Sequence, residues 1–301
     1  MSFEDPAVIT CAISGSIADR AQCPAIPYTP AEYAAEARRV VDEGGVHIHI
    51  HARRSDGTPS YEVEDFQAIK EAIVAEVGDQ AIINFSTGTI GVPVAKRVAY
   101  LEAGRPEVAA LNMGSLNYAK YSHKRKDFVF SFVFANPFEE IVELLQAMQR
   151  LGIKPEHECF DLGHVGSLAP LLDMGLLEAP LHADFVMGVM GGVPATARNL
   201  AAMAENLPSI SLAGGAHSHH WGVIGIGRAQ WMLVAAALTL GGSVRVGLED
   251  NFYLPDGTMA RSNGELIAKA RAMTLDTGRR PATVAEARTL LGIRPPVTTT
   301  A

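Results

Sequence analysis

Three histidines spaced two residues apart constrain this chain more than any other feature. They lie in Val46-His47-Ile48-His49-Ile50-His51, a run that otherwise has the apolar character of a buried β-strand. Side chains two residues apart in a strand point to the same side, so three imidazoles would project together. Because burying an imidazole costs free energy unless its nitrogen atoms find partners, the run predicts a hydrogen-bonded or metal-binding interior.

A second run, Arg245-Val246-Gly247-Leu248-Glu249-Asp250-Asn251, ends in adjacent carboxylates far along the chain. A His-x-His pair together with one carboxylate is typical of a catalytic zinc site, which has three protein ligands and an open position. His49 and His51, like Asp250, fall where a strand gives way to a loop. We interpret His47 as a hydrogen-bonded core histidine one layer deeper.

The composition allows a large core and excludes several classes of protein. Of 301 residues, 48% are hydrophobic and 19% are charged, and the net charge of −8 is unlike that of a nucleic-acid-binding surface. The cysteines Cys11, Cys23 and Cys159 show no paired spacing, which favours a reducing compartment. The sequence shows no signal peptide and no membrane-spanning run, so we expect a soluble cytoplasmic protein.

Strand-like and helix-like stretches alternate from end to end and predict a single domain over residues 1–301. The predicted strands are Ala7–Ser14, Val46–Ala52, Ala81–Ser86, Val108–Met113, Lys154–Phe160, Ala183–Val189, a stretch within Ser209–Gly227, and Ser243–Glu249. Eight strand–helix units favour an α/β fold of the (β/α)8 TIM-barrel type, with a doubly wound open sheet as the alternative. The dinucleotide fingerprint Gly-x-Gly-x-x-Gly does not follow the first strand.

Start signals mark several helices. Thr29-Pro30-Ala31-Glu32 is a capping box with proline at the first helical position, and Asn136-Pro137-Phe138-Glu139 has the same arrangement. The second helix ends at Gly152, and its apolar face is traced by Phe138, Val142, Leu145 and Met148. An extra strand, Phe128–Phe134, precedes this helix, and we expect it to form a lid or an oligomer contact.

The barrel prediction gathers the polar residues at one place, because active sites of such barrels form at the C-terminal ends of the strands. The residues at those predicted ends are Ser14 and Ser16, His49 and His51, Ser86 and Thr87, Asn112, Glu158, and Glu249 with Asp250. Residues that are scattered through the sequence would therefore meet at one mouth.

Several stretches keep an order and spacing shared with one known family. They are Ile9–Ser16, Ile48–Arg53, Asn84–Gly88, Leu111–Asn117, Pro155–Glu158, Phe185–Val189, Gly225–Arg228, Arg245–Asn251 and Arg280–Thr283. In them the chain resembles, over nearly its whole length, the β-keto acid cleavage enzymes, a family that includes 3-keto-5-aminohexanoate cleavage enzyme. The resemblance implies a zinc-dependent TIM barrel, usually a homotetramer, that converts a β-keto acid and acetyl-CoA to acetoacetate and a new acyl-CoA.

The resemblance also implies residue roles. It assigns metal binding to His49, His51 and Glu249, catalysis to Asp250 as general base and Arg245 as its orienting partner, and substrate contact to Ser86, Asn112 and Glu158. Two neutral imidazoles and one carboxylate leave Zn²⁺, or another divalent metal, with positive charge and free positions. A structural ion pair is the alternative for Arg245 and Asp250. On physics alone, Ser86 is equally suited to cap a helix and Asn112 to close a turn.

The chain departs from the family pattern at two places. In the aminohexanoate-cleaving member, a glutamate that helps to hold the substrate's amino group stands where this chain has Ile17. An aliphatic side chain cannot pair with an ammonium group, so we expect Ile17 to face an uncharged or apolar acyl tail.

The second departure is a longer passage, Leu212–Trp221, which contains His217, His219 and His220. We interpret it as a polar surface loop near the barrel mouth, with a second metal site or a contact with the substrate tail as the alternative.

Glycine-rich turns after two strands suggest where acetyl-CoA would bind. Gly225-Ile226-Gly227-Arg228 precedes a helix, and we nominate Gly227 and Arg228 for the CoA phosphates because helix N-termini favour anions; Gly191-Gly192 offers a similar turn.

Two other functions compete with the acyl transfer. One is a metal-dependent hydrolase of the amidohydrolase type, which also uses His-x-His in a barrel, typically on the first strand. The other is a barrel that only binds a ligand.

Overall fold

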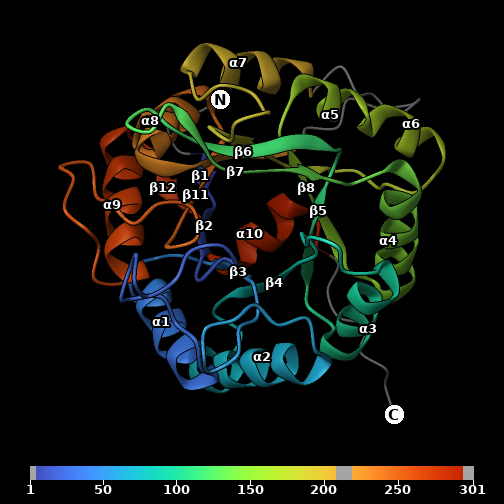
Figure 1. Cartoon of the computed structure of the whole chain (residues 1–301), viewed down its shortest axis with the longest axis horizontal. Coiled ribbons are helices and arrows are strands. Elements are labelled where there is room, and N and C mark those ends of the chain that lie inside the picture. Colours follow the sequence, from blue (N-terminus) through green and yellow to red (C-terminus); the bar gives the residue numbers. More distant parts are fainter. Residues whose placement is uncertain (1–4, 208–218, 294–301) are drawn as a thin grey trace.

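The structure is a computed structural model that describes residues 5–207 and 219–293. Eight parallel strands close into a barrel whose order follows the sequence, which confirms the predicted TIM barrel and rules out an open sheet (Figure 1). The barrel strands are β2 (Ile9–Ala12), β3 (His47–Ile50), β4 (Ile82–Ser86), β5 (Val108–Asn112), β8 (Lys154–Cys159), β9 (His182–Met187), β10 (His220–Gly225) and β11 (Ser243–Val246).

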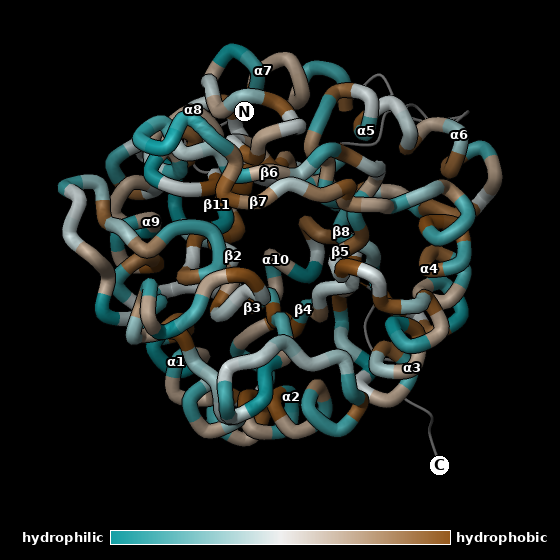
Figure 2. Tube along the Cα trace, viewed as in Figure 1, coloured by the Kyte–Doolittle hydropathy of each residue, from teal (hydrophilic) through white to brown (hydrophobic). Residues whose placement is uncertain are grey.

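Helices form a ring around the barrel (Figure 1). They are α1 (Pro30–Asp42), α2 (Val63–Val77), α3 (Val94–Gly104), α4 (Phe138–Leu151), α5 (Leu162–Gly166), α6 (Leu168–Asp173), α7 (Ala197–Asn206), α8 (Gln230–Leu240) and α9 (Asn263–Asp276). Hydrophobic and hydrophilic residues alternate along most of them, as an amphipathic helix that covers a sheet requires (Figure 2). Within the described ranges, no helix combines the length and the apolarity needed to cross a bilayer.

Aromatic packing joins the ring to the barrel. Phe66 of α2 stacks on Tyr100 of α3 with ring centroids 4.1 Å apart, and it also contacts Phe85 of β4 at 4.8 Å. All three rings are buried. Truncating a buried phenylalanine of this kind to alanine costs about 3–5 kcal/mol of stability.

The two predicted helix starts had different outcomes. The capping box of Thr29 and Glu32 is confirmed, since the Thr29 Oγ1 accepts from the Glu32 amide and the Glu32 carboxylate accepts from the Thr29 amide. The prediction for Asn136 is wrong, because its side-chain amide donates to the carbonyl of Gly114 at 3.2 Å and Pro137 caps α4. The predicted apolar face is shifted as a result. Phe138 is 55% exposed, and the buried face consists of Ile141, Leu144, Leu145, Ala147 and Met148.

The bottom of the barrel is closed by α10 (Val284–Leu291), which lies behind the strands in Figure 1. Its Ala287 and Leu291 pack in one apolar cluster with residues at the N-terminal ends of the strands, namely Val8, Val46, Ile82 and Val108. A short parallel pair, β1 (Pro6–Ala7) and β12 (Arg280–Pro281), lies near this end. Hydrocarbon therefore covers the side of the barrel bottom that β2, β3, β4 and β5 form.

An antiparallel hairpin crosses the opposite end of the barrel in Figure 1. It consists of β6 (Leu116–Ser122) and β7 (Asp127–Phe134), whereas the sequence predicted only its second strand. The first strand was missed because Asn117-Tyr118-Ala119-Lys120 lacks a clear apolar alternation. Tyr118 of β6 stacks on Phe132 of β7 with ring centroids 5.2 Å apart, so one face of the hairpin is aromatic.

Candidate active site

A cluster of two histidines and one carboxylate lies at the mouth end of the barrel. This upper cluster consists of His49 on β3, His51 just beyond that strand, and Glu249 in the turn after β11. The Nε2 atoms of His49 and His51 lie 3.7 Å and 3.4 Å from carboxylate oxygens of Glu249. Ligand atoms of all three residues lie within 4.8 Å of one another, close enough to hold one metal ion.

The protonation states of the upper cluster suit a metal ion. Burial lowers the pKa of His49 well below its usual value, and the charge of Arg245 lowers it further. Burial opposes ionisation of Glu249, but the nearby charge of Arg245 is the largest opposing influence, and the pKa of Glu249 lies well below normal. Both ring nitrogens of His49 and one oxygen of Glu249 have no hydrogen-bond partner among the described residues. A neutral imidazole and an ionised carboxylate are the forms that coordinate a divalent ion.

Gly15 makes room for Glu249. Its φ of +60° lies in the left-handed region, and a Cβ atom there would stand 2.8 Å from the Cγ of Glu249. The buried guanidinium of Arg53 donates to the carbonyls of Gly15 (2.9 Å) and Gly57 (2.8 Å), so it fixes the loop that carries Gly15. Arg53 has no role among the sequence-based predictions. The sequence feature that points to this role is the position of Arg53 directly after a predicted buried strand. A buried guanidinium there needs several hydrogen-bond acceptors.

The backbone of His51 is held from the β2–α1 side of the barrel. Its carbonyl oxygen accepts hydrogen bonds from the Tyr33 hydroxyl at 2.6 Å and from the Ser14 hydroxyl at 2.9 Å. Tyr33 is fully buried on α1. These contacts fix the backbone position from which the imidazole of His51 projects toward Glu249.

Arg245 connects three carboxylates. Its guanidinium makes two 3.0 Å hydrogen bonds to Asp250, one of 2.8 Å to Glu249 and one of 2.9 Å to Glu158. Burial opposes its charge, but these carboxylates raise the pKa of Arg245 well above the usual value, so the charge is permanent. The forked contact with Asp250 sets the orientation of that carboxylate.

Asp250 is suited to accept a proton near neutral pH. Burial raises the pKa of its carboxyl group to about 7, with a further increase from Glu249, although Arg245 acts in the opposite direction. Its carbonyl oxygen accepts a hydrogen bond of 2.8 Å from the amide of Gly227, which ties the turn after β11 to the turn after β10.

A cavity of about 750 Å³ opens from this cluster toward the hairpin. Its inner end is formed by His51, Glu249, Asp250 and Arg245, and the substrate-contact residues of the sequence prediction also line it: Ile17, Ser86, Asn112 and Glu158. Gly227 and Arg228, nominated for CoA, lie on its wall as well, where Gly227 begins a 3₁₀ turn, η1 (Gly227–Ala229). The structure thus gathers these positions around one cavity.

The helix-cap alternative for Ser86 is wrong, because its hydroxyl accepts from the amide of Gly88 at 3.2 Å and the next helix begins only at Val94. Asn112 faces the same turn, since a Cβ atom on Gly88 would come 2.9 Å from the side-chain nitrogen of Asn112. Both side chains therefore border the cavity from neighbouring strands.

The predicted place of the histidine loop is wrong for its described part. His220 begins β10 and pairs with His182 of β9, at the end of the barrel opposite the mouth. Its ring centroid lies 5.5 Å from that of His182, so it faces the lower interior. His219 directly precedes this strand, whereas His217 lies outside the described residues.

Two further ionisable residues precede Glu158 on β8. His157 is buried and its Nδ1 lies 2.7 Å from the carbonyl of His182. Glu156 lies in the interior one layer below Glu158, 3.9 Å from the Nε2 of His47. His47 is deeper than the upper cluster, as predicted, and its Nδ1 shares a 3.0 Å hydrogen bond with Thr10.

Known proteins match the chain over nearly its full length. The profile of the beta-keto acid cleavage enzyme family matches residues 6–293. A protein of Fusobacterium nucleatum named 3-keto-5-aminohexanoate cleavage enzyme is 35% identical over 287 residues, which cover 95% of this chain and 98% of that protein. A protein of Cupriavidus necator named 3-oxoadipate:acetyl-CoA acetyltransferase is 33% identical over 288 residues, which cover 96% of this chain and 95% of that protein.

A solved structure supports the fold independently. The ternary complex of ObcA with a C4-CoA adduct and oxalate superposes with a TM-score of 0.71 over 89% of this chain and 68% of that chain, at 22% identity. The family profile and the two relatives show that the chain is an enzyme that belongs to the beta-keto acid cleavage enzyme family.

Proposed function

We propose that this enzyme uses Zn²⁺ and acetyl-CoA to convert a β-keto acid with an uncharged or apolar tail to acetoacetate and a new acyl-CoA. The observation that carries the proposal is one cavity that joins the upper cluster and Asp250 to an apolar outer wall. The names of the relatives support the reaction class, since that of the Cupriavidus necator protein includes acetyl-CoA and a 3-oxo acid.

The donor set of the upper cluster fits a divalent ion. His49, His51 and Glu249 offer two imidazole nitrogens and one carboxylate, the set typical of catalytic zinc. When bound, the ion would supply positive charge that attracts the carboxylate and keto oxygens of the substrate. The unpartnered nitrogens of His49 support this assignment, because a buried donor or acceptor without a partner costs about 1–3 kcal/mol.

Asp250 transfers the proton in the proposed reaction, and Arg245 positions the carboxylate of Asp250. Asp250 takes a proton from the carbon between the carboxylate and the keto group of the β-keto acid, and Arg245 holds its carboxylate in place. The resulting carbanion attacks the carbonyl carbon of acetyl-CoA, and CoA thiolate leaves. The thiolate then attacks the original keto carbon, whose bond to the central carbon breaks. Asp250 returns the proton to that carbon, which gives acetoacetate and the new acyl-CoA.

Other wall residues position the two substrates. Ser86 and Asn112 present a hydroxyl and an amide to the cavity, and both groups can bind substrate oxygens. Glu158 lies in the same wall and is held by Arg245 at 2.9 Å. The guanidinium of Arg228 lies 5.7 Å from the ring centroid of Tyr253, so a cation stands at the cavity wall where CoA phosphates would enter.

The outer part of the cavity favours an apolar tail. Ile17, Ile90, Val129 and Met190 line it, and their exposed fractions are 61%, 59%, 45% and 47%. The carboxylates in the lining are Glu158, Glu249 and Asp250, and all three are engaged by Arg245 at the inner end. An ammonium group on the tail would therefore lose water without gaining a partner.

The test is acetoacetate release from a panel of β-keto acids, measured by mass spectrometry with acetyl-CoA labelled in the acetyl group. We expect labelled acetoacetate, an acyl-CoA that carries the tail, and the highest kcat/KM for aliphatic tails. Turnover without CoA would instead indicate a hydrolase, and equal kcat/KM for the 5-amino substrate would contradict the tail preference.

The homotetramer and the cytoplasmic location are further parts of this proposal, which light scattering and cell fractionation would test.

A further inference from the structure

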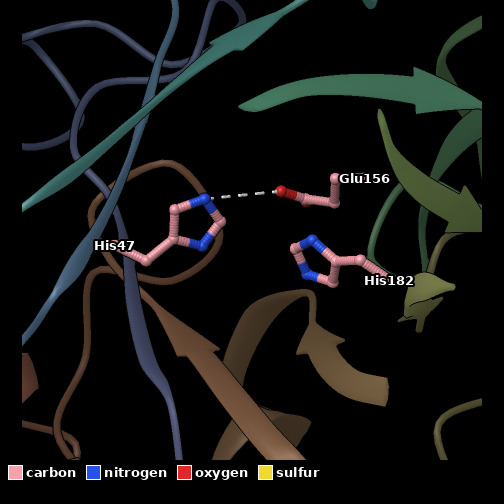
Figure 3. A group of neighbouring side chains, drawn as sticks. All are labelled: His47, Glu156 and His182. Atoms are coloured by element: carbon pink, nitrogen blue, oxygen red, sulfur yellow. Dashed lines mark ion pairs between the residues drawn. The ribbon is translucent and has the colours of Figure 1, made fainter. Parts of the chain in front are cut away.

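A second set of ligand-type side chains lies beneath the upper cluster. This lower cluster consists of His47 on β3, Glu156 on β8 and His182 on β9, whose side chains converge in the barrel interior (Figure 3). Its ligand atoms lie within 4.8 Å of one another, and each residue is at most 1% exposed. We propose that the lower cluster binds a second divalent metal ion of the zinc class, with a structural role and independent of the proposed reaction.

Each member of the lower cluster has one polar atom anchored and another without a partner. The Nδ1 of His47 is bound to Thr10 at 3.0 Å, and the Nε2 of His182 lies 3.3 Å from the carboxylate of Asp184. In the part of the chain that the structure describes, His47 Nε2 and His182 Nδ1 have no hydrogen-bond partner. A histidine held at one nitrogen by a hydroxyl or carboxylate, with the other nitrogen unpartnered, is arranged like a metal ligand with its supporting partner.

Glu156 completes the arrangement. One of its carboxylate oxygens accepts a hydrogen bond from the side-chain amide of Asn84, and that same oxygen lies 3.9 Å from His47 Nε2. Its other oxygen has no donor within hydrogen-bond distance among the described residues and lies 3.8 Å from Arg245, and the carboxyl group also interacts with the side chain of Asp184. Two imidazoles and one carboxylate form the same donor set as the upper cluster, which suits Zn²⁺ and its neighbours rather than Mg²⁺ or Ca²⁺.

Carboxylates outnumber cationic side chains around the two clusters. Five carboxylates and one guanidinium lie in this part of the barrel. Arg245 contacts Glu156, Glu158, Glu249 and Asp250 at 3.8 Å or less, and Asp184 lies 3.3 Å from the Nε2 of His182. With all five carboxylates ionised and the histidines neutral, the net charge would be −4, and one divalent ion in each cluster would bring it to zero. The alternative is protonation of the lower cluster, since burial and the charge of Asp184 raise the pKa of Glu156 well above its usual value when no cation is bound.

The position of the lower cluster determines how it would take up its ion. The upper cluster lies toward the cavity, whereas each ligand of the lower cluster is at most 1% exposed. The ion therefore enters while the barrel folds and does not exchange in the native state. It joins β3, β8 and β9, and His49 and Glu158 each lie two residues beyond a lower ligand on the same strand.

The test is metal content by plasma mass spectrometry on protein produced in zinc-supplemented cells. We expect about two ions per chain, about one after His49→Ala, about one after Glu156→Gln, and none in the double variant. The matched control is His157→Gln, a buried histidine on the same strand as Glu156 that lies outside the cluster; it should keep both ions. A chelator should remove the upper ion from native protein and the lower ion only after denaturation.

A crystallographic measurement covers the case in which a variant fails to fold. Anomalous diffraction at the zinc edge on the unaltered protein should show a peak between His47 Nε2, Glu156 and His182 Nδ1. A peak at the upper cluster alone, with one ion per chain, would overturn the inference and assign the lower layer to protonated side chains. A peak at the lower cluster alone would support the inference and count against the metal assignment of the proposed function.

Discussion

The upper and lower clusters share the strand β3 and the same kinds of donor atom, but they differ in access to solvent and in their partners. The upper cluster borders a cavity of about 750 Å³, and its carboxylate is held by Arg245 at 2.8 Å. The lower cluster is at most 1% exposed and is held by Thr10, Asn84 and Asp184. The comparison teaches that the two-residue repeat of a strand can present the same donor atoms at two depths, of which only one borders the cavity.

The difference is clearest against the usual interior of such a barrel. Bulky aliphatic side chains dominate the stacked layers of most TIM barrels. Here the strands instead bring histidines, carboxylates and an arginine into the interior, and the hydrophobic closure is left to α10 at the bottom. The stability of this interior therefore depends on polar groups that have hydrogen-bond or ionic partners. We expect changes in the upper cluster to affect mainly activity and changes in the lower cluster to affect mainly folding.

The largest effect should follow from Asp250→Asn in the upper layer. The amide keeps the shape but cannot take up the substrate proton, so kcat/KM should fall by about 10²–10⁴-fold. Steady-state acetoacetate release measures this change, with thermal unfolding as the control for folding. A loss of less than tenfold would show that another group acts as the base.

Gly15→Ala should weaken metal binding in the upper layer only. The added Cβ would meet the Cγ of Glu249 at 2.8 Å, and displacing one ligand should lower metal affinity by about 10–100-fold. Gly78→Ala is the matched control, because its φ of +62° is nearly the same and nothing lies within 4 Å. Competition with a metal-binding dye measures the affinity. Equal losses in both variants would mean that backbone strain alone is responsible.

Asn84→Ala tests the lower layer. It removes the amide that donates to Glu156 and leaves a buried carboxylate oxygen with one partner fewer, so the free energy of unfolding should fall by about 1–3 kcal/mol. Denaturant titration measures the change, and Asn206→Ala, an exposed asparagine on α7, is the control. Since Asn84 does not line the cavity, kcat/KM should fall far less than in Asp250→Asn. If Asn84→Ala lowered kcat/KM more than Asp250→Asn does, the functional separation of the lower cluster from the upper cluster would be wrong.

The smallest expected effect is a shift in tail preference from Ile17→Glu, beyond the upper cluster. A carboxylate at this 61% exposed position gains about 1 kcal/mol with a cationic tail, roughly fivefold in relative kcat/KM. Ile17→Leu should leave the preference for aliphatic tails in place. If the glutamate variant also keeps that preference, Ile17 does not face the tail.

Local patterns were sufficient for much of the fold and part of the site. Thr29 and Glu32 form the predicted capping box, because that motif depends on residues three apart. The same logic misplaced Asn136, whose side chain is taken by the distant carbonyl of Gly114. The pairing of Glu249 with His49 and His51 was inferred from strand ends and resemblance, whereas the roles of Arg53 and Asn84 depend on contacts between strands that no spacing reveals.

The sequence by itself determined the alternation of strands and helices, the common direction of His47, His49 and His51, and the carboxylates at a strand end, because these follow from the periods of the backbone. Only the tertiary structure decided which layer each side chain joins. Glu156 and His182 meet His47 because closure of the barrel sets the register between neighbouring strands. That register arises from packing of the whole ring, so it is not encoded in any single segment.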